Sequence, residues 1–145
     1  MPSTRTETIP YGDEYLRAEL PERTRTLTAN LPLPAVLDVR EAVRAAIADP
    51  IAHEPLHKLV GPKSRVTIAF DDASGAYFQT RRADFRQVAI ELIVEELRGA
   101  GVELGNIKLL CAQGLHRKLS RTEMETFLGR RLVLQFGYNN LYCHD

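Results

Sequence analysis

The stretch RVTIAFDD, residues 65–72, decides the fold, because its continuous apolar centre is typical of a strand covered on both faces of a sheet. A long helix is expected to begin near Asp84, where a glutamine three residues further on fits a helix cap. Gly99 and Gly101 are expected to end that helix. The apolar segment NIKLLCAQ, residues 106–113, then predicts a second strand.

A further helix and strand follow this unit. Ser120 and Glu123 have the spacing of a capping box, which predicts a short helix over residues 123–129. Apolar segments predict strands at residues 132–136 and 141–143. The order strand, long helix, strand, helix, strand is typical of a right-handed parallel arrangement. We therefore predict an α/β fold, a mainly parallel sheet flanked by helices in the Rossmann-like manner.

The first part of the chain is expected to be a small β extension. Residues 1–35 read as an extended lead-in, with a turn at residues 11–13 between two short runs. Threonines alternate along residues 23–31, which favours an edge strand. A helix is predicted from Asp38 to the residue before Pro50.

The composition is that of one globular domain. The chain has 145 residues, with 19 basic and 19 acidic side chains, so its charge gives no case for binding nucleic acid or an anionic membrane. It has no apolar run of membrane-spanning length, and its first fifteen residues lack the apolar core of a secretory signal. We therefore expect a cytoplasmic protein in which Cys111 and Cys143 are reduced thiols.

Candidate site residues follow the predicted strands. Ligands bind parallel α/β sheets at the carboxyl ends of the strands. Asp71 and Asp72 follow the first of these strands, Gly114 and His116 follow the second, and His144 follows a third. An imidazole there can exchange a proton near neutral pH. The position alone leaves open a histidine that hydrogen-bonds a loop and an aspartate that caps a turn.

The order of short motifs resembles the N-terminal part of the nickel-pincer lactate racemase family. The family pattern has Y-G, P-I-G-x-x-P-L, D-D-x-T-R-P, A-T-G-x-H-R-P-x-T, L-G and N-H-D in that order. The matching segments cover nearly the whole chain: IPYGD (9–13), PIAHEPLHKLV (50–60), VTIAFDDAS (66–74), LRGAGV (97–102), IKLLCAQGLHRKLSRTEMETFLG (107–129) and CHD (143–145).

The resemblance implies roles for particular residues. His116 matches the first catalytic acid/base histidine, and Asp72 matches an aspartate that organises the substrate site. Neighbouring motif positions are expected to bind substrate or cofactor: Asp71, Ser74, Gly75, Gln113, Gly114 and Arg117.

Some motif positions depart from the family pattern. Gly75 stands where the family has an arginine that grips the substrate carboxylate, and glycine offers no charge. Gln113 replaces a threonine, and Lys118 replaces a proline. Arg81 or Arg82 could supply the missing charge. These departures leave open a substrate other than lactate or a loss of activity.

The resemblance also implies a cofactor and a reaction. The cofactor is a nickel-pincer nucleotide derived from nicotinic acid mononucleotide, and the substrate is a small 2-hydroxy acid that loses and regains hydride at its α-carbon. The lysine that tethers the cofactor, the histidine that ligates nickel, the second acid/base histidine and the C-terminal domain would lie beyond Asp145. No metal ligand is therefore expected within this chain.

The chain is accordingly expected to be an isolated domain, a truncated gene product or one half of a split enzyme. Alone it is expected to be inactive as an isomerase. Its expected partner is the C-terminal domain or a second subunit, and an exposed interdomain face could also support a homo-oligomer. The alternative is a non-catalytic domain that keeps the fold and binds a ligand or partner.

Overall fold

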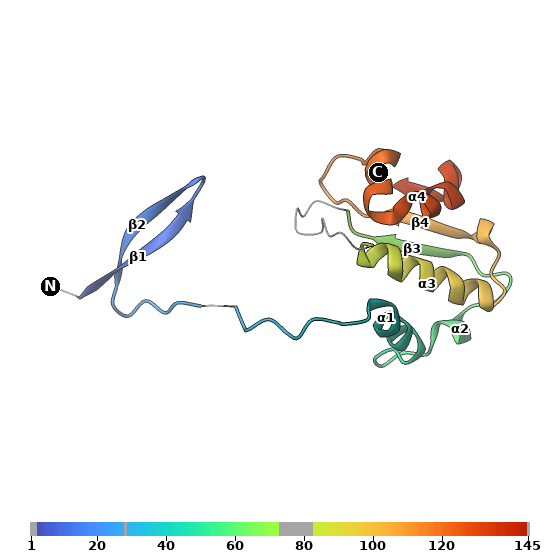
Figure 1. The fold of residues 1–145 in the computed structure, drawn as a ribbon, viewed down its shortest axis with the longest axis horizontal. Helices are drawn as coiled ribbons and strands as arrows, with labels where there is room; N and C mark the ends of the chain where they lie inside the picture. The colour runs from blue at the N-terminus through green and yellow to red at the C-terminus, as the bar shows by residue number, and fades with distance from the viewer. Residues whose placement is uncertain (1–2, 28, 73–82, 145) are drawn as a thin grey trace. The chain divides into compact units, whose positions relative to one another are not determined.

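A computed structural model of the chain describes residues 3–27, 29–72 and 83–144 (Figure 1). The chain divides into two compact units, Met1–Ala35 and Val36–Asp145. Within the described ranges, no helix is both long enough and apolar enough to cross a membrane.

The first unit contains an antiparallel hairpin. Strand β1 (Thr4–Tyr11) pairs with β2 (Glu14–Pro21), and Ile9 lies opposite Leu16. Gly12 has a φ of +61°, which glycine adopts without the clash that a side chain would cause. The predicted turn between two short runs is therefore confirmed.

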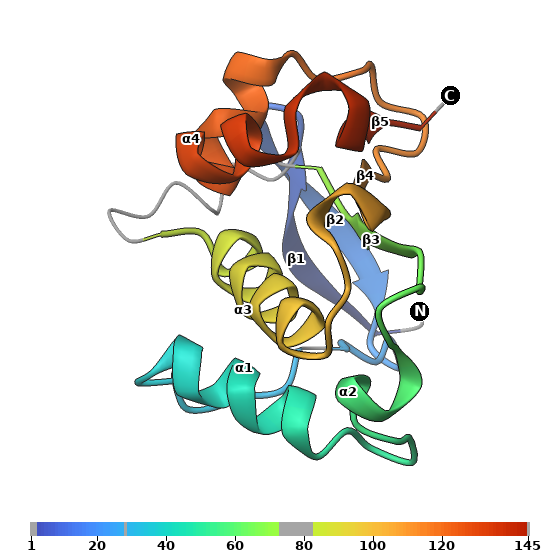
Figure 2. The same cartoon turned by 90° about the vertical axis from the view of Figure 1, so that its right-hand side faces the viewer.

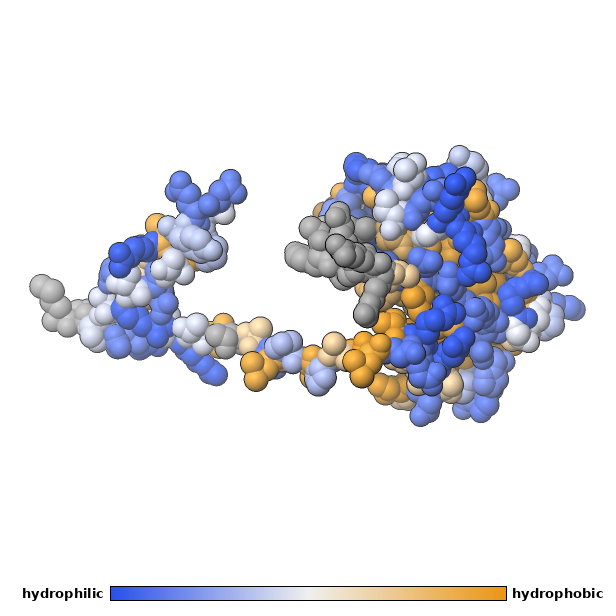
Figure 3. Space-filling model, in the orientation of Figure 1, coloured by the Kyte–Doolittle hydropathy of each residue, from blue (hydrophilic) through white to orange (hydrophobic). Residues whose placement is uncertain are grey.

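The strand predicted at residues 23–31 is wrong. Neither residues 24–27 nor residues 29–31 form a strand, although alternating threonines favour extended backbone. Among the described residues, β1 and β2 pair only with each other, so residues 24–27 and 29–31 have no hydrogen-bonded partner strand. Leu31 and Leu33 are exposed. Figure 3 shows apolar side chains along this part of the chain after the hairpin.

The second unit opens with helix α1 (Val39–Ala48), as predicted. The Asp38 side chain accepts a hydrogen bond from the Glu41 backbone N–H at 3.0 Å, which caps the first turn. A short helix, α2 (Leu56–Leu59), follows.

The sheet of the second unit has three parallel strands in the order β3–β4–β5. Helix α3 (Phe85–Gly99) joins the first two strands, and α4 (Arg121–Asn140) joins the last two. Since the strands are added in one direction by right-handed connections, both helices lie on one face, as Figure 2 shows. The predicted α/β class is confirmed. The strands are β3 (Val66–Phe70), β4 (Ile107–Cys111) and β5 (Leu141–Cys143).

The expectation that the first of these strands is covered on both faces is wrong. Along β3, Ile68 and Phe70 point toward the core, whereas Thr67 and Ala69 are exposed. Both connecting helices cover the same face, so the other face carries no helix within residues 36–72 and 83–144. The other residues on this open face of the sheet are Lys108, Leu110 and Tyr142.

Helix α3 ends as the sequence predicted. The Gly101 N–H donates to the Arg98 carbonyl and the Val102 N–H donates to the Leu97 carbonyl, both at 3.0 Å. This is the Schellman arrangement, and Gly101 has the positive φ of +88° that it requires. Leu97 and Val102 are both fully buried, so the helix end is tied to the core. A 3₁₀ turn (Leu104–Asn106) then leads into β4.

The strand predicted at residues 132–136 is wrong, because this segment belongs to α4. Leu132, Val133 and Phe136 are all buried, and positions i, i+1 and i+4 share one face of a helix. Apolar residues in a short run did not distinguish a strand from a helix. Gly129 departs from helical geometry with a φ of +76°, so the predicted short helix does end there in a kink.

Candidate functional site

His116 and Asp72 form a close pair at the carboxyl edge of the sheet. The His116 Nδ1 atom lies 2.7 Å from Asp72 Oδ2, although 44 positions separate the residues along the chain. The Asp72 side chain is 8% exposed, whereas that of His116 is 59% exposed. The pair therefore presents an accessible imidazole on a buried carboxylate.

The sheet itself brings these residues together. Asp72 follows β3 by two residues, and β4, which precedes His116, is the neighbouring strand. Gly114 has a φ of +60°, and the His116 N–H donates to the Gln113 carbonyl at 3.1 Å. The resulting turn carries the imidazole toward the end of β3. The expectation that both residues meet at one sheet edge is thus met in the structure.

The hydrogen bond indicates which nitrogen of the imidazole is the donor. An ionised carboxylate only accepts hydrogen bonds, so Nδ1 must carry the proton that it donates to Asp72. The remaining nitrogen, Nε2, is then the basic one. An imidazole oriented in this way by a carboxylate is able to act as a general base.

A cavity of about 330 Å³ opens beside the pair. Both members of the pair line it, and the ring of Phe127 and the side chain of Leu119 give it an apolar part. Its volume is within the range of small-molecule sites. The rest of the lining is Arg117, Glu123 and Thr126.

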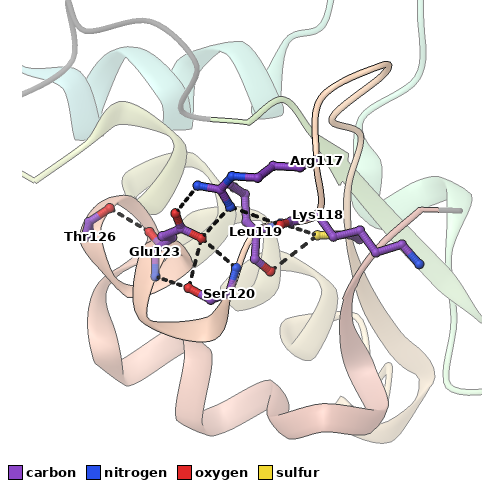
Figure 4. Close-up of polar contacts among 7 residues, drawn as sticks. Arg117, Lys118, Leu119, Ser120, Glu123 and Thr126 are labelled. Carbon is purple, nitrogen blue, oxygen red and sulfur yellow. Dashed lines mark hydrogen bonds and ion pairs between the residues drawn. The ribbon is translucent and has the colours of Figure 1, made fainter.

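Arg117 and Glu123, which also line the cavity, form a second ion pair (Figure 4). The Arg117 guanidinium donates to both carboxylate oxygens of Glu123, at 3.0 Å and 2.5 Å. Glu123 also closes the predicted capping box with Ser120, whose N–H donates to Glu123 Oε2 at 2.8 Å. The hydrogen bonds from Arg117 and Ser120 lower the pKa of Glu123 to about 2. The carboxylate is therefore ionised at neutral pH and neutralises Arg117.

Gln113 and Gly114 support the turn and do not line the cavity. Gln113 is buried, and its Nε2 donates to the His144 carbonyl at 2.8 Å. The Gly114 N–H donates to His144 Nε2 at 3.1 Å, and the His144 N–H donates to the Cys111 carbonyl at 3.1 Å. The third strand end thus contributes a histidine that holds the turn before His116. The sequence placed His144 there but gave it no role.

Arg86 is a site residue that the sequence analysis missed. Its Nη1 donates to the backbone carbonyls of Asp72 and Asp71, at 2.5 Å and 3.3 Å. The Asp71 side chain is 71% exposed, and its Oδ1 lies 3.8 Å from Arg86 Nη1, so Asp71 contacts Arg86 through its carboxylate as well as its main chain. The expected basic partners were Arg81 and Arg82, which lie outside the described residues. The signal available in the sequence was an Asp-x-Arg spacing at a helix start.

Other expected features have these positions. Ser74 and Gly75 lie outside the described residues. Cys111 and Cys143 are free thiols at paired positions of β4 and β5. Burial, with a smaller effect of Cys143, raises the pKa of Cys111 to about 12. Within the described ranges, no group of three or more His, Cys, Asp or Glu side chains is arranged to hold a metal ion.

Comparisons with known proteins agree with the fold and with the order of motifs. Residues 11–145 match the family model of the lactate racemase N-terminal domain. Among solved structures, the chain is similar to the lactate racemase apoprotein from Thermoanaerobacterium thermosaccharolyticum, with 25% identity and a TM-score of 0.59. The match covers 97% of this chain and 30% of that one. A search of curated proteins found no match.

Proposed function

Since the chain belongs to the family of lactate racemase N-terminal domains, we propose that it supplies an acid/base histidine for the racemisation of a small 2-hydroxy acid. The observation that carries this proposal is the hydrogen bond between His116 Nδ1 and the buried Asp72 carboxylate. The chain spans 30% of the length of the lactate racemase apoprotein that it resembles. The complete reaction is therefore proposed for this chain together with a C-terminal part of the kind that the family has.

The proposed role of His116 is to move the hydroxyl proton of the substrate. Inversion of a 2-hydroxy acid by hydride removal converts the C–O bond to a carbonyl, and this requires the hydroxyl oxygen to lose its proton. His116 Nε2 takes that proton while Asp72 holds the imidazolium. When hydride returns to the opposite face of the carbonyl carbon, the oxygen regains a proton from His116 Nε2 or from the second acid/base histidine expected outside this chain.

The cavity supplies a candidate contact for the substrate carboxylate. Arg117 lines the cavity together with His116, and a guanidinium suits a carboxylate. Arg117 is already paired with Glu123. A substrate carboxylate would therefore share the guanidinium with Glu123 or displace Glu123. We propose that Arg117 takes the place of the arginine that the family has at the position of Gly75.

The implied cofactor is proposed for the complete protein. A bound nickel-pincer nucleotide would supply the site that accepts and returns hydride. Because the described residues form no cluster suited to a metal ion, we assign no nickel ligand among them and derive no step through nickel. The step proposed for this chain is the transfer of the substrate's hydroxyl proton to and from His116.

The open face of the sheet is the proposed contact with the remaining part of the protein. Thr67, Ala69 and Lys108 are exposed on it, and no described helix covers them. In doubly wound sheets, helices cover both faces. We propose that the C-terminal domain or a second subunit covers this face, and that a homo-oligomer forms in its absence.

The proposal is tested by racemisation in the complete protein that carries this chain, produced together with the enzymes that make the cofactor. Each enantiomer of a panel of 2-hydroxy acids is incubated in D₂O, and both configuration and deuterium at the α-carbon are measured. We expect racemisation without deuterium at that carbon, because hydride does not exchange with solvent. His116→Ala should lower the rate by about 10²–10⁴-fold, the usual contribution of a general base.

The matched control is His53→Ala, since His53 is an exposed histidine that lies outside this cavity. It should leave the rate unchanged. If His116→Ala and His53→Ala have the same rate, His116 is not the acid/base residue. A cofactor-loaded protein that racemises no acid of the panel would favour the alternative of a non-catalytic ligand-binding domain.

A further inference from the structure

Arg86 is a buried arginine at the first turn of α3. Its side chain is 3% exposed, and that of its partner Asp84 is 6% exposed. The pair is bidentate, with Arg86 Nε 2.9 Å from Asp84 Oδ1 and Arg86 Nη2 2.8 Å from Asp84 Oδ2. Two of the three guanidinium nitrogens are thereby fixed by one carboxylate.

The third nitrogen connects this ion pair to the end of β3. Arg86 Nη1 donates to the Asp72 carbonyl at 2.5 Å and to the Asp71 carbonyl at 3.3 Å. The guanidinium carbon also lies 4.6 Å from the centre of the Phe127 ring, which lines the cavity beside His116. The start of α3, the end of β3 and the first part of α4 therefore meet at one guanidinium.

This arrangement is more than a helix cap. Asp84 Oδ1 already accepts the Arg86 backbone N–H at 2.9 Å, so the cap does not need the guanidinium. A buried ion pair is often no more stabilising than an apolar pair of similar volume. An apolar pair would, however, offer no donor to the Asp72 carbonyl. What the arginine adds is a fixed position for the main chain of Asp72.

The charge of Arg86 also acts on the site. Hydrogen bonds with Asp84 raise the pKa of Arg86 and outweigh the effect of burial, so the guanidinium is charged. The negative charges of Asp71 and Asp72 contribute in the same direction.

We propose that Arg86 is a positioning residue for the acid/base pair: it fixes the backbone of Asp72 so that the carboxylate holds His116 with its proton on Nδ1. The inference rests on the proposed function of His116 and extends it to a third residue. Arg86 reaches the reacting groups through Asp72, so it is not itself a catalytic residue. Its effect should appear in the tautomer of His116.

The test measures imidazole ¹⁵N shifts by NMR on the ¹⁵N-labelled chain, at about pH 8.5, where histidine is neutral. His116→Gln assigns the signal among the 4 histidines. The main variant is the double change Asp84→Asn with Arg86→Met, which removes both buried charges and keeps a capping side chain at position 84. Asp72→Ala removes the acceptor and breaks the proposed pair directly.

Arg121→Met is the matched control. Arg121 also stacks on an aromatic ring, 4.1 Å from the centre of Tyr138, and its Nη2 donates to the Val133 carbonyl at 2.7 Å. It makes no hydrogen bond to Asp72 or His116. A general loosening of the fold would therefore affect the control as well, whereas loss of positioning would not.

We expect the wild type and Arg121→Met to show His116 mainly protonated on Nδ1. The double variant, folded by circular dichroism, should lose at least half of that population. A folded double variant with the wild-type signal would overturn the role of Arg86. If Asp72→Ala also leaves the signal unchanged, the His116–Asp72 pair itself fails, and the two failures are thereby distinguished. If the double variant does not fold, Arg86→Lys is measured instead, with the same expected loss and the same overturning result.

Discussion

The hairpin and the parallel sheet are both built from paired strands, but they bury very different amounts of side chain. Strands β1 and β2 have eight residues each, and every one of them is exposed or half-buried. Strand β4 has five residues, and three of these are fully buried: Ile107, Leu109 and Cys111.

The difference separates strand pairing from stabilisation. Pairing satisfies backbone donors and acceptors in both units, but a two-stranded hairpin alone is only marginally stable in water. Apolar burial supplies the dominant favourable term, and in this chain it is concentrated between the sheet and helices α3 and α4. Measured stability should therefore depend on core residues of the second unit and hardly at all on hairpin side chains.

Leu97→Ala should have the largest effect on stability, and it tests the difference between the two units most directly. Leu97 is fully buried at the end of α3, and truncation leaves a cavity in the core. We expect the free energy of unfolding to fall by about 2–5 kcal/mol in urea denaturation. The control is Leu16→Ala in the half-exposed hairpin position, which should change it by less than about 0.5 kcal/mol. Equal effects would contradict the division between the units.

Glu91→Ala should have a smaller effect on the same unit. Glu91 accepts hydrogen bonds from Arg131 at 2.9 Å and from Arg40 at 3.2 Å, so it links α3 to α4 and α1. Losing a carboxylate that receives charged donors should cost about 1–3 kcal/mol in urea denaturation. Glu95→Ala is the control, because Glu95 is exposed and should contribute at most about 1 kcal/mol. A larger loss of stability in Glu95→Ala than in Glu91→Ala would mean that the contact between the helices does not depend mainly on Glu91.

Acid should remove the contribution of Glu123. Because the folded-state pKa of about 2 is lower than the ordinary value of 4.5, the stabilisation is present above about pH 4.5 and is lost as the pH falls toward 2. Wild type should be more stable than Glu123→Gln at pH 7, and the two unfolding curves should approach each other below about pH 4.5 and converge only below about pH 2. A difference that does not change with pH would contradict the lowered pKa.

Thr6→Ala should have the smallest effect. The Thr6 hydroxyl donates to Glu19 across the exposed hairpin, at 2.5 Å. Exposed substitutions of this kind change stability by less than about 0.5 kcal/mol. Calorimetry should show the same melting temperature as the wild type. A shift of several degrees would mean that the hairpin shares the cooperative unit of the sheet.

The sequence predicted the elements whose ends carry local signals. The turn at Gly12, the caps at Asp38 and Ser120 and the glycine end of α3 are each decided by a few neighbouring residues, and all were correct. The prediction of a strand at residues 132–136 was wrong because a short apolar run is compatible with the periodicity of a strand and with that of a helix. Only packing against the sheet decides that Leu132, Val133 and Phe136 share a helix face.

The candidate site was partly predictable for a similar reason. Strand order places Asp72 and His116 at one edge, so their meeting could be expected from the topology. Arg86 could not be found in this way, because its importance depends on the direction of Nη1 and on burial against Phe127. Side-chain direction across three elements is a property of the packed structure.

The capping box of α4 also bears on the order of folding. Its bonds join residues three positions apart, and the Arg117–Glu123 pair joins residues six positions apart. The His116–Asp72 bond instead spans 44 positions and needs two strands in register. Local helix formation takes about 0.1–1 μs, whereas distant contacts wait for loop closure and strand pairing. We expect the helix start beside the site to form early in folding, and the His116–Asp72 pair to assemble only when the native sheet is complete.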